Sequence, residues 1–203
     1  MLLLDVNYNE KDEAKKLGAR WNPELKKWYV NDRKDYHKFI KFINGNIIII
    51  DNLYLIEGKQ NCFKCGKETR VIGFGIDKYI NIDDDYINFS NDDDIHIVGA
   101  IEPIPEKLIK YIQEKYNYKM RFSKTTQTSN MSNCCDNCDI LQGNFFLFNE
   151  VDSPFFITSI DDVKRLKIYK ITLDNDITIN ADYSYANYDF MFKKYGNIIE
   201  LKL

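Results

Sequence analysis

The chain has 203 residues, of which 44% are hydrophobic and 14% aromatic, and its formal net charge is −3 at pH 7. A chain of this size and apolar content buries a core in one domain or two, which excludes intrinsic disorder. The small acidic charge excludes a protein that is basic throughout, and no apolar run approaches the roughly 20 residues that a membrane helix needs.

The amino-terminal apolar run, Met1 to Leu4, ends at Asp5 and is too short for a secretory signal. We therefore expect a cytoplasmic protein with reduced thiols and no membrane partner. Charge is unevenly distributed, because residues 1–43 hold ten Lys or Arg against seven Asp or Glu, whereas residues 68–102 hold two against nine. This distribution is compatible with a basic binding face and equally with ordinary solvated faces.

The first part of the chain predicts a compact β-α-β unit followed by a second helix. Residues 2–6 and 27–30 have strand character, and Asn9 is placed to cap an intervening helix that Gly18 ends. Residues 32–43 carry apolar side chains at helical spacing.

Basic and aromatic side chains gather around the second predicted strand. Indole and guanidinium planes stack on unpaired bases while lysines contact phosphates, and each base–aromatic stack contributes about 1–3 kcal/mol. The alternative is that the tryptophans form the core of a small domain. We favour a core position for Trp28, which places Tyr29 on the opposite side of the strand. The candidate nucleic-acid contacts are Arg20, Trp21, Lys26, Lys27 and Tyr29.

The run from Glu10 to Val30 reads EKDEAKKLGARWNPELKKWYV and resembles the module catalogued as DUF5710, which carries the pattern KDEAK-LGARWD…KKWYV. The resemblance covers residues 1–45 and departs from the pattern at Asn22, where the family usually has aspartate. It implies the fold of this unit and an association with DNA-handling proteins of plasmids and phages, including DNA primases of conjugative plasmids. It implies no activity.

Two cysteine pairs, Cys62 with Cys65 and Cys135 with Cys138, have the spacing of metal-binding turns. Two cysteines separated by two residues turn both sulfurs toward one point, and two such pairs supply the four thiolates of a closed zinc site. Cys134 makes the register ambiguous, but the two-residue spacing to Cys138 favours Cys135 as the ligand.

The residues around the cysteines partly support a shared metal site. Gly66 fits the tight turn after the first pair, and Asp139 is a weaker but acceptable turn residue after the second. Residues 66–134 separate the pairs, far more than the roughly 15–20 residues of a compact zinc ribbon. Either this segment is an inserted subdomain or the pairs do not share a metal. The thiols could instead be buried apolar cysteines or disulfides, although reduced thiols favour a metal.

The remaining segments carry weaker signals. The acidic clusters Asp83 to Asp85 and Asp92 to Asp94 are more typical of solvated loops than of a two-metal catalytic site. The predicted elements are two short strands around a turn at Asp51 within residues 47–56, a strand at 69–76, a helix at 105–116, a loop at 125–132, and strands within 168–179 and 198–203 that close a sheet.

The stretch from Cys135 to Phe156 contains the runs LQGNFF and SPFF. It is similar to the carboxyl-terminal, zinc-ribbon-like part of uncharacterised bacterial proteins that begin with the same module and show CxxCG, LQGDFF and GPFF. This chain departs from those patterns at Asp139, Asn144 and Ser153. The departures leave the four ligands intact and leave open any role of the missing aspartate.

Patterns for catalysis are absent from the sequence. Neither His37 nor His96 has a neighbour that suggests a triad, and the chain has no phosphate loop, dinucleotide fingerprint or HExxH. Four thiolates leave no open position on zinc, so the metal is expected to be structural.

We therefore predict an α+β protein with a DUF5710-like module at residues 1–45 and a zinc-ribbon-like domain at residues 46–203, interrupted by an insertion at 66–134. The expected function is that of a non-enzymatic accessory protein of a phage or mobile element that binds single-stranded nucleic acid. The alternative is a protein-interaction adaptor or inhibitor that uses its Phe-rich segment 145–156 or its acidic segment 83–94.

Overall fold

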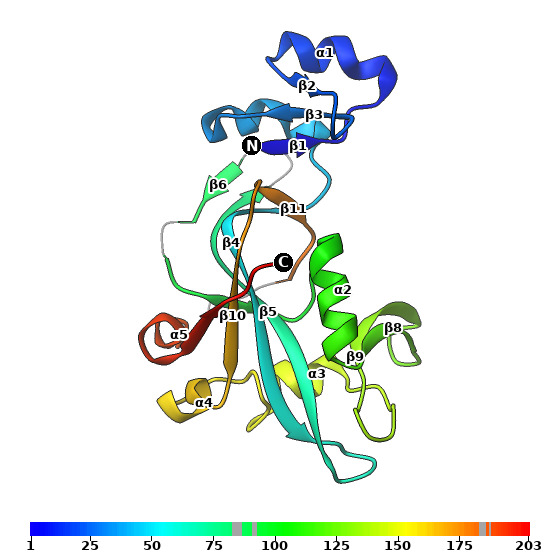
Figure 1. Ribbon diagram of the computed structural model, residues 1–203, viewed down its shortest axis with the longest axis vertical. Coiled ribbons are helices and arrows are strands. Elements are labelled where there is room, and N and C mark those ends of the chain that lie inside the picture. Colours follow the sequence, from blue (N-terminus) through cyan, green and yellow to red (C-terminus); the bar gives the residue numbers. More distant parts are fainter. Residues whose placement is uncertain (83–86, 91–92, 183–185, 187) are drawn as a thin grey trace.

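The computed structural model describes the chain except for residues 83–86, 91–92, 183–185 and 187, and it confirms the α+β class (Figure 1). The described residues form a three-stranded, a seven-stranded and a two-stranded sheet with short helices. The strands are β1 (Leu2–Leu4), β2 (Arg20–Asn22), β3 (Lys27–Val30), β4 (Ile47–Asn61), β5 (Glu68–Ile82), β6 (Ile87–Phe89), β7 (His96–Val98), β8 (Tyr118–Ser123), β9 (Thr128–Asn133), β10 (Lys167–Thr172), β11 (Ile177–Ile179) and β12 (Asn197–Glu200). The helices are η1 (Tyr8–Glu10), α1 (Lys11–Lys16), η2 (Arg33–Phe42), α2 (Glu106–Lys115), α3 (Asn144–Phe148), α4 (Ile160–Lys164) and α5 (Phe190–Tyr195).

The amino-terminal module contains the predicted strand, helix and strand as β1, α1 and β3, and its sheet is antiparallel in the order β1-β3-β2. Strand β2 was not expected. It forms a hairpin with β3 through a turn in which Asn22 Oδ1 accepts hydrogen bonds from the backbone N–H groups of Glu24 and Leu25. This extra reversal makes β3 antiparallel to β1, whereas a parallel return needs a longer crossover.

The helices of the module differ from the expectation at their starts. Asn9 lies within the 3₁₀ turn η1, and α1 begins at Lys11, so Asn9 is not its cap. Gly18 ends α1 with a φ of +105°, as expected for a helix-terminating glycine. The predicted second helix is present as the 3₁₀ helix η2, whose first turn is capped by the Asp32 side chain.

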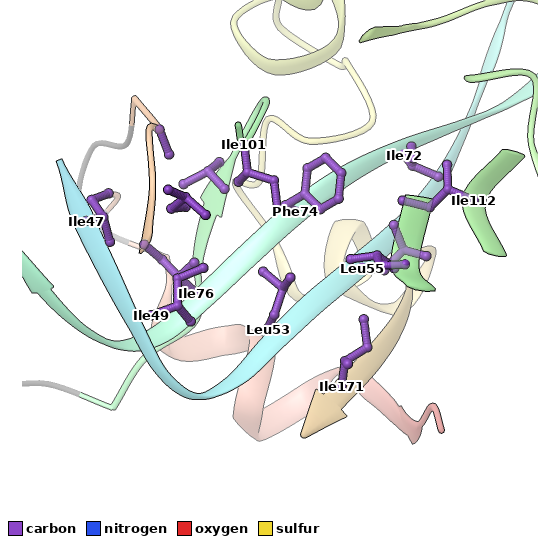
Figure 2. Close-up of a cluster of buried hydrophobic side chains, with 14 of the residues drawn as sticks. Ile47, Ile49, Leu53, Leu55, Ile72, Phe74, Ile76, Ile101, Ile112 and Ile171 are labelled. Atoms are coloured by element: carbon purple, nitrogen blue, oxygen red, sulfur yellow. The ribbon is translucent and has the colours of Figure 1, made fainter. Parts of the chain in front are cut away.

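The seven-stranded sheet is built on the long hairpin of β4 and β5, which pair from Ile47 opposite Asn81 to Asn61 opposite Glu68. The prediction of two short strands within 47–56 is wrong, because the chain passes through Asp51 as a β-bulge and continues pairing. Asp51 has a φ of +62°, and β4 curves sharply between Ile49 and Leu53 (Figure 2). The strand expected at 69–76 is confirmed and extends in both directions as β5.

Both faces of this sheet are buried, which explains the continuous apolar run at the start of β4. Ile47 and Ile49 join a core with α2, whereas Ile48 and Ile50 pack against the amino-terminal module. Figure 2 shows the first of these cores, including Phe74 of β5. A third core lies under α3, α4 and α5, so helices cover parts of both faces (Figure 1).

The segment 66–134, expected as an insertion, contributes β5, β6 and β7 to the central sheet, and its helix α2 packs in the core beside that sheet. Helix α2 confirms the helix predicted for 105–116, with Leu108 and Ile112 fully buried. The loop predicted for 125–132 is wrong, since Thr128–Asn133 pairs with β8 along its whole length. The carboxyl-terminal strands are confirmed: β10 and β11 pair with β4, and β12 pairs with β10.

The junction between the module and the central sheet is fixed by hydrogen bonds. Asn46 exchanges side-chain bonds with the backbone of Ala181, at 3.0 Å in both directions. Its backbone N–H donates to the carbonyl of Ile179, and its carbonyl accepts from the N–H of Ile82. The module therefore lies at one end of the β4–β5 hairpin, and the loop with the first cysteine pair lies at the other (Figure 1).

Of the acidic clusters, Asp83 to Asp85 and Asp92 lie outside the described residues. No helix in the described part of the chain is long and apolar enough to cross a membrane.

Candidate metal centre

The two cysteine pairs converge on one point. Cys62 and Cys65 lie in the turn that joins β4 to β5, and Cys135 and Cys138 lie in the turn that follows β9. Their sulfur atoms all lie within 4.8 Å of one another, and the pairs Cys62–Cys138 and Cys65–Cys135 are each 3.7 Å apart.

These distances fit a shared metal and exclude disulfides. A disulfide requires sulfurs about 2.05 Å apart, and all five cysteines are free thiols. A tetrahedral ion with metal–sulfur bonds of about 2.3 Å separates its sulfurs by about 3.8 Å, close to the observed 3.7 Å. The four cysteines could therefore hold one metal ion in a closed shell without an open position for water.

The two cysteine turns have the same backbone geometry. In the first, Gly66 N–H donates to the Cys62 carbonyl at 2.8 Å, and in the second Asp139 N–H donates to the Cys135 carbonyl at 3.0 Å. Gly66 and Asp139 have φ values of +71° and +60°. Such a φ favours glycine, and aspartate is one of the side chains that tolerate it.

Asp139 is held in this conformation by the β8 side of the structure. Its carboxylate accepts a hydrogen bond from Asn117 and ion-pairs with Lys119 and Arg121. These partners, of which the hydrogen bonds of Lys119 are the largest cause, lower the pKa of Asp139 to about 2. The residue that replaces glycine in the second turn thus also anchors that turn to β8.

Polar contacts align the second turn with the start of β5. Asp136 N–H donates to the buried Thr69 hydroxyl at 2.9 Å, and the Asn137 amide donates to the Glu68 carbonyl at 3.0 Å. Arg70 adds an ion pair to Asp136 at 3.0 Å. Because these bonds join the two turns directly, the protein itself brings the cysteine pairs into register.

Hydrogen bonds also reach the sulfurs. Asn137 N–H donates to Cys135 Sγ at 3.3 Å, and the buried amide of Gln142 donates to Cys62 Sγ at 3.6 Å. Burial acts to raise the pKa of Cys135, but the backbone N–H groups of Asn137 and Cys138 and the neighbouring thiols lower it to about 6. The backbone N–H of Ile140 acts to lower the pKa of Cys138, but burial and the same neighbouring thiols raise it to about 12, so Cys135 is the thiol that ionises first. Such a thiol readily provides the thiolate that a metal requires.

Cys134 stands apart from the four converging cysteines. It is buried, and its sulfur accepts a hydrogen bond from Arg121 Nε at 3.5 Å. The geometry therefore places Cys135, rather than Cys134, opposite Cys65.

Asn133 connects the second cysteine turn to β5 in a way that the sequence did not indicate. Its side-chain amide is buried and exchanges two hydrogen bonds of 2.8 Å with the backbone N–H and carbonyl of Ile72. These two bonds take the place of the bonds that a neighbouring strand would make with Ile72. Asn133 itself lies directly before the second cysteine turn.

Asn133→Ala is expected to lower the free energy of unfolding by about 1–3 kcal/mol, because two buried backbone groups of Ile72 lose their partners. The measurement is urea denaturation combined with hydrogen exchange at the Ile72 amide. Asn133→Asp is the matched variant, since it keeps the acceptor for the N–H but places an oxygen against the carbonyl. Unchanged protection of Ile72 in Asn133→Ala would contradict this role.

The five candidate nucleic-acid contacts lie on both sides of the module's sheet. Paired residues of antiparallel strands point to the same side, so Arg20 lies beside Tyr29 and Trp21 beside Trp28. The indole rings of Trp21 and Trp28 meet edge to face at 5.7 Å, and Trp21 is 49% exposed at the edge strand β2. The side of the sheet that carries Trp21 and Trp28 also faces the core, because Leu4 is paired with Trp28 and is buried.

A pocket of about 490 Å³ lies beside Trp21. It is lined by Trp21, Trp28, Lys26, Lys27, Asp5 and Asn44, among other residues. The Lys27 ammonium forms an ion pair with Asp5 at 2.5 Å, whereas Lys26 has no ion-pair partner among the described residues. Three of the five candidate contacts thus share one pocket, and Arg20 and Tyr29 lie around the edge of β2.

The two histidines have different surroundings. His37 is exposed and contacts the Lys34 carbonyl, whereas His96 is buried and its Nδ1 lies 2.7 Å from Asp189 Oδ2. The two partners are far apart in sequence, and no spacing pattern connects them.

Comparison with protein families matches residues 1–44 to DUF5710, described as a domain of unknown function. This confirms the resemblance of the amino-terminal module, while that of the cysteine region stays a prediction. A stretch of 42 residues is 48% identical to the DNA primase TraC of Escherichia coli, an alignment that covers 21% of this chain and 3% of TraC. The chain therefore corresponds to only a small part of that primase. No solved structure matches the chain.

Proposed function

We propose that this protein is a non-enzymatic accessory protein of a plasmid, phage or similar mobile element that binds single-stranded nucleic acid and is stabilised by structural zinc. The observation that carries the proposal is the module's similarity to a small part of the DNA primase TraC, together with an exposed tryptophan flanked by lysines. The alignment supports a role in DNA handling, and the tryptophan and the lysines are side chains that can bind a base and its phosphates.

Zinc is the proposed metal because of the donor set. Four thiolates in tetrahedral array suit zinc or iron, and zinc is the usual ion where two Cys-x-x-Cys turns enclose one site. The closed shell assigns the ion a structural role and leaves binding to other surfaces.

The proposed nucleic-acid site is the pocket beside Trp21. An unpaired base would stack on the half-exposed indole, which Trp28 supports from one edge. Lys26 and Lys27 lie at the same pocket and would contact the flanking phosphates. Because β2 is the edge strand, the next nucleotides could reach Arg20 and Tyr29 on the other side of the sheet.

Trp21→Ala is expected to weaken binding of a fluorescent single-stranded oligonucleotide by about 5- to 150-fold, because one base–aromatic stack contributes about 1–3 kcal/mol. Lys26→Ala is expected to reduce the slope of log affinity against log salt concentration by about 1, which corresponds to the loss of one phosphate contact. The measurement is fluorescence anisotropy at several salt concentrations, with a duplex of the same sequence as competitor.

Two further variants make this test specific. Phe122→Ala removes an aromatic side chain that is 56% exposed on β8, far from the module, and should leave binding unchanged. Asp5→Asn releases Lys27 from its ion pair and should strengthen binding at low salt. The proposal is wrong if the wild type fails to bind at low salt, or if Trp21→Ala binds as the wild type does.

A second candidate function, a protein-interaction adaptor or inhibitor, is favoured by an exposed aromatic patch beside the first cysteine turn. Phe63 is 74% exposed, and Phe145 and Phe146 are each 59% exposed. Phe63 and Phe146 border a groove of about 640 Å³. Such a patch on a soluble protein often marks a protein contact. A pull-down that recovers a reproducible partner with the wild type but not with Phe63→Ser would support this function.

A further inference from the structure

The groove beside the first cysteine turn, which has a volume of about 640 Å³, is both apolar and negatively charged. It lies between the end of β4 and the loop that follows α3, and the exposed rings of Phe63 and Phe146 border it. The only charged side chains among its described lining residues are those of Glu150 and Asp152. Ser153 also lines the groove and carries a buried hydroxyl without a hydrogen-bond partner in the described part of the chain. The loop is therefore incompletely hydrogen-bonded in a single chain.

Strand β4 has an open edge beside this groove. On the side away from β5, the pairing of β4 with β10 stops at Glu57, which lies opposite Lys167. Every second residue of a strand directs its backbone N–H and C=O groups to the same side, so those of Lys59 and Asn61 point the same way as those of Glu57. Neither residue has a backbone partner on that side among the described residues. Since Asn61 also lines the groove, the open edge and the groove adjoin.

The hairpin of β8 and β9 presents a surface that matches the groove. Strand β8 pairs with β9 and with no other described strand, so its second edge is open as well. Met120 and Phe122 lie on one face of β8 and are 59% and 56% exposed. Residues 118–133 contain no Asp or Glu. The basic residues of this segment are Lys119, Arg121 and Lys124.

Charge decides which occupant the groove favours. Asp139 forms ion pairs with both Lys119 and Arg121, so one carboxylate serves two cations, and Lys124 has no ion-pair partner among the described residues. The hairpin therefore keeps a net positive charge, which the carboxylates of the groove attract, whereas they repel the phosphates of a nucleic acid. Both surfaces are exposed at the same time in a single chain, so the hairpin does not fill its own groove.

We propose that β8 of one copy of this chain adds to the open edge of β4 in a second copy. Backbone hydrogen bonds would join the two strands at Lys59 and Asn61, and Met120 and Phe122 would enter the groove. Because the contact joins two different surfaces, each copy offers one groove and one hairpin. The proposal rests on the second candidate function, a protein contact at Phe63, and names a second copy of the chain as the partner.

The test is analytical ultracentrifugation of the purified full-length protein from about 1 to 500 µM, because small interfaces have dissociation constants in the micromolar range. The wild type should associate as its concentration rises. Phe63→Ser damages the groove and Phe122→Ser damages the hairpin, and each change should weaken association at least about tenfold. An equal mixture of the two variants should form a 1:1 complex, since the first keeps its hairpin and the second keeps its groove.

Two further variants make the test specific. Tyr8→Ser removes an aromatic side chain that is 82% exposed in the module, outside both surfaces, and should associate as the wild type does. Glu150→Lys should weaken association severalfold at low salt, because it reverses one charge of the groove. Since Phe63 and Phe122 are exposed, their variants should keep the circular dichroism spectrum of the wild type.

Three results would overturn the proposal: a wild type that stays monomeric at every concentration, a mixture of Phe63→Ser and Phe122→Ser that stays monomeric, or loss of oligothymidylate binding in Phe63→Ser, which would assign the groove to nucleic acid. A monomeric wild type that captures another protein through Phe63 would refute the second copy as the partner and would leave the adaptor function standing.

Discussion

Cys65→Ser and Cys138→Ser are each expected to lose the metal and to unfold the end of the β4–β5 hairpin together with the second cysteine turn. In sites of this type the metal-binding free energy, about 10–16 kcal/mol in zinc-finger peptides, is largely folding free energy. Serine removes one of the four ligands and leaves three thiols crowded within 4.8 Å of one another. The expected result is a large fall in the midpoint of thermal unfolding and loss of hydrogen-exchange protection in residues 58–72 and 133–142.

The position of the tryptophans makes this experiment diagnostic. The chain has two tryptophans, Trp21 and Trp28, and both lie in the amino-terminal module. Tryptophan fluorescence should therefore stay native while the cysteine end loses protection, and a chelator added to the wild type should reproduce the same pattern. Cys134→Ser is the matched control and should behave as the wild type. Native protection in Cys65→Ser would show that the four cysteines do not hold a stabilising ion.

Asp176→Ala is expected to destabilise the junction between the module and the central sheet by about 3 kcal/mol. Asp176 is 4% exposed and accepts hydrogen bonds from Arg33 and from the buried hydroxyl of Tyr36, both in the module. Removing one partner of a buried ion pair costs about 3–5 kcal/mol, and the lower value applies because the Arg33 side chain is 40% exposed. Burial and the bond to Asp176 also raise the pKa of Tyr36 well above its usual range.

The measurement is urea denaturation followed both by tryptophan fluorescence and by far-ultraviolet circular dichroism. In Asp176→Ala the fluorescence transition, which reports the module, should move to lower urea than in the wild type. Asp51→Asn is the control: Asp51 pairs with the same Arg33 but is 42% exposed, and exposed pairs contribute less than about 1 kcal/mol. Equal effects of the two substitutions would show that Asp176 does not secure the junction.

Local patterns in the sequence predicted those elements whose side chains face one core. Helix α2 is an example, because its apolar residues recur at helical spacing and meet a single buried face. Strand β9 was missed since it is polar apart from Met131 and, among the described residues, pairs with β8 alone, so no alternation marks it. The bulge at Asp51 was read as a turn because Asp-Asn is typical of turns, and long-range pairing with β5 decided otherwise.

The four cysteines of the candidate metal centre were predictable, because the spacing within each pair is a local property of the sequence. The residues that hold these cysteines in place were not predictable. Asn133, Gln142 and Thr69 act across long sequence separations, through hydrogen bonds that no spacing rule indicates. The long gap between the pairs likewise gave no sign that residues 66–134 form part of the central sheet. The run LQGNFF was the single local signal, since it includes Gln142.

The metal content of the purified protein, measured with a thiol count on the wild type and on Cys134→Ser, tests the central claim most directly. We expect one zinc per chain in both proteins and no disulfide, because the four sulfurs of Cys62, Cys65, Cys135 and Cys138 converge without Cys134. A chain without zinc, or a Cys134→Ser protein that has lost it, would contradict the shared four-cysteine site.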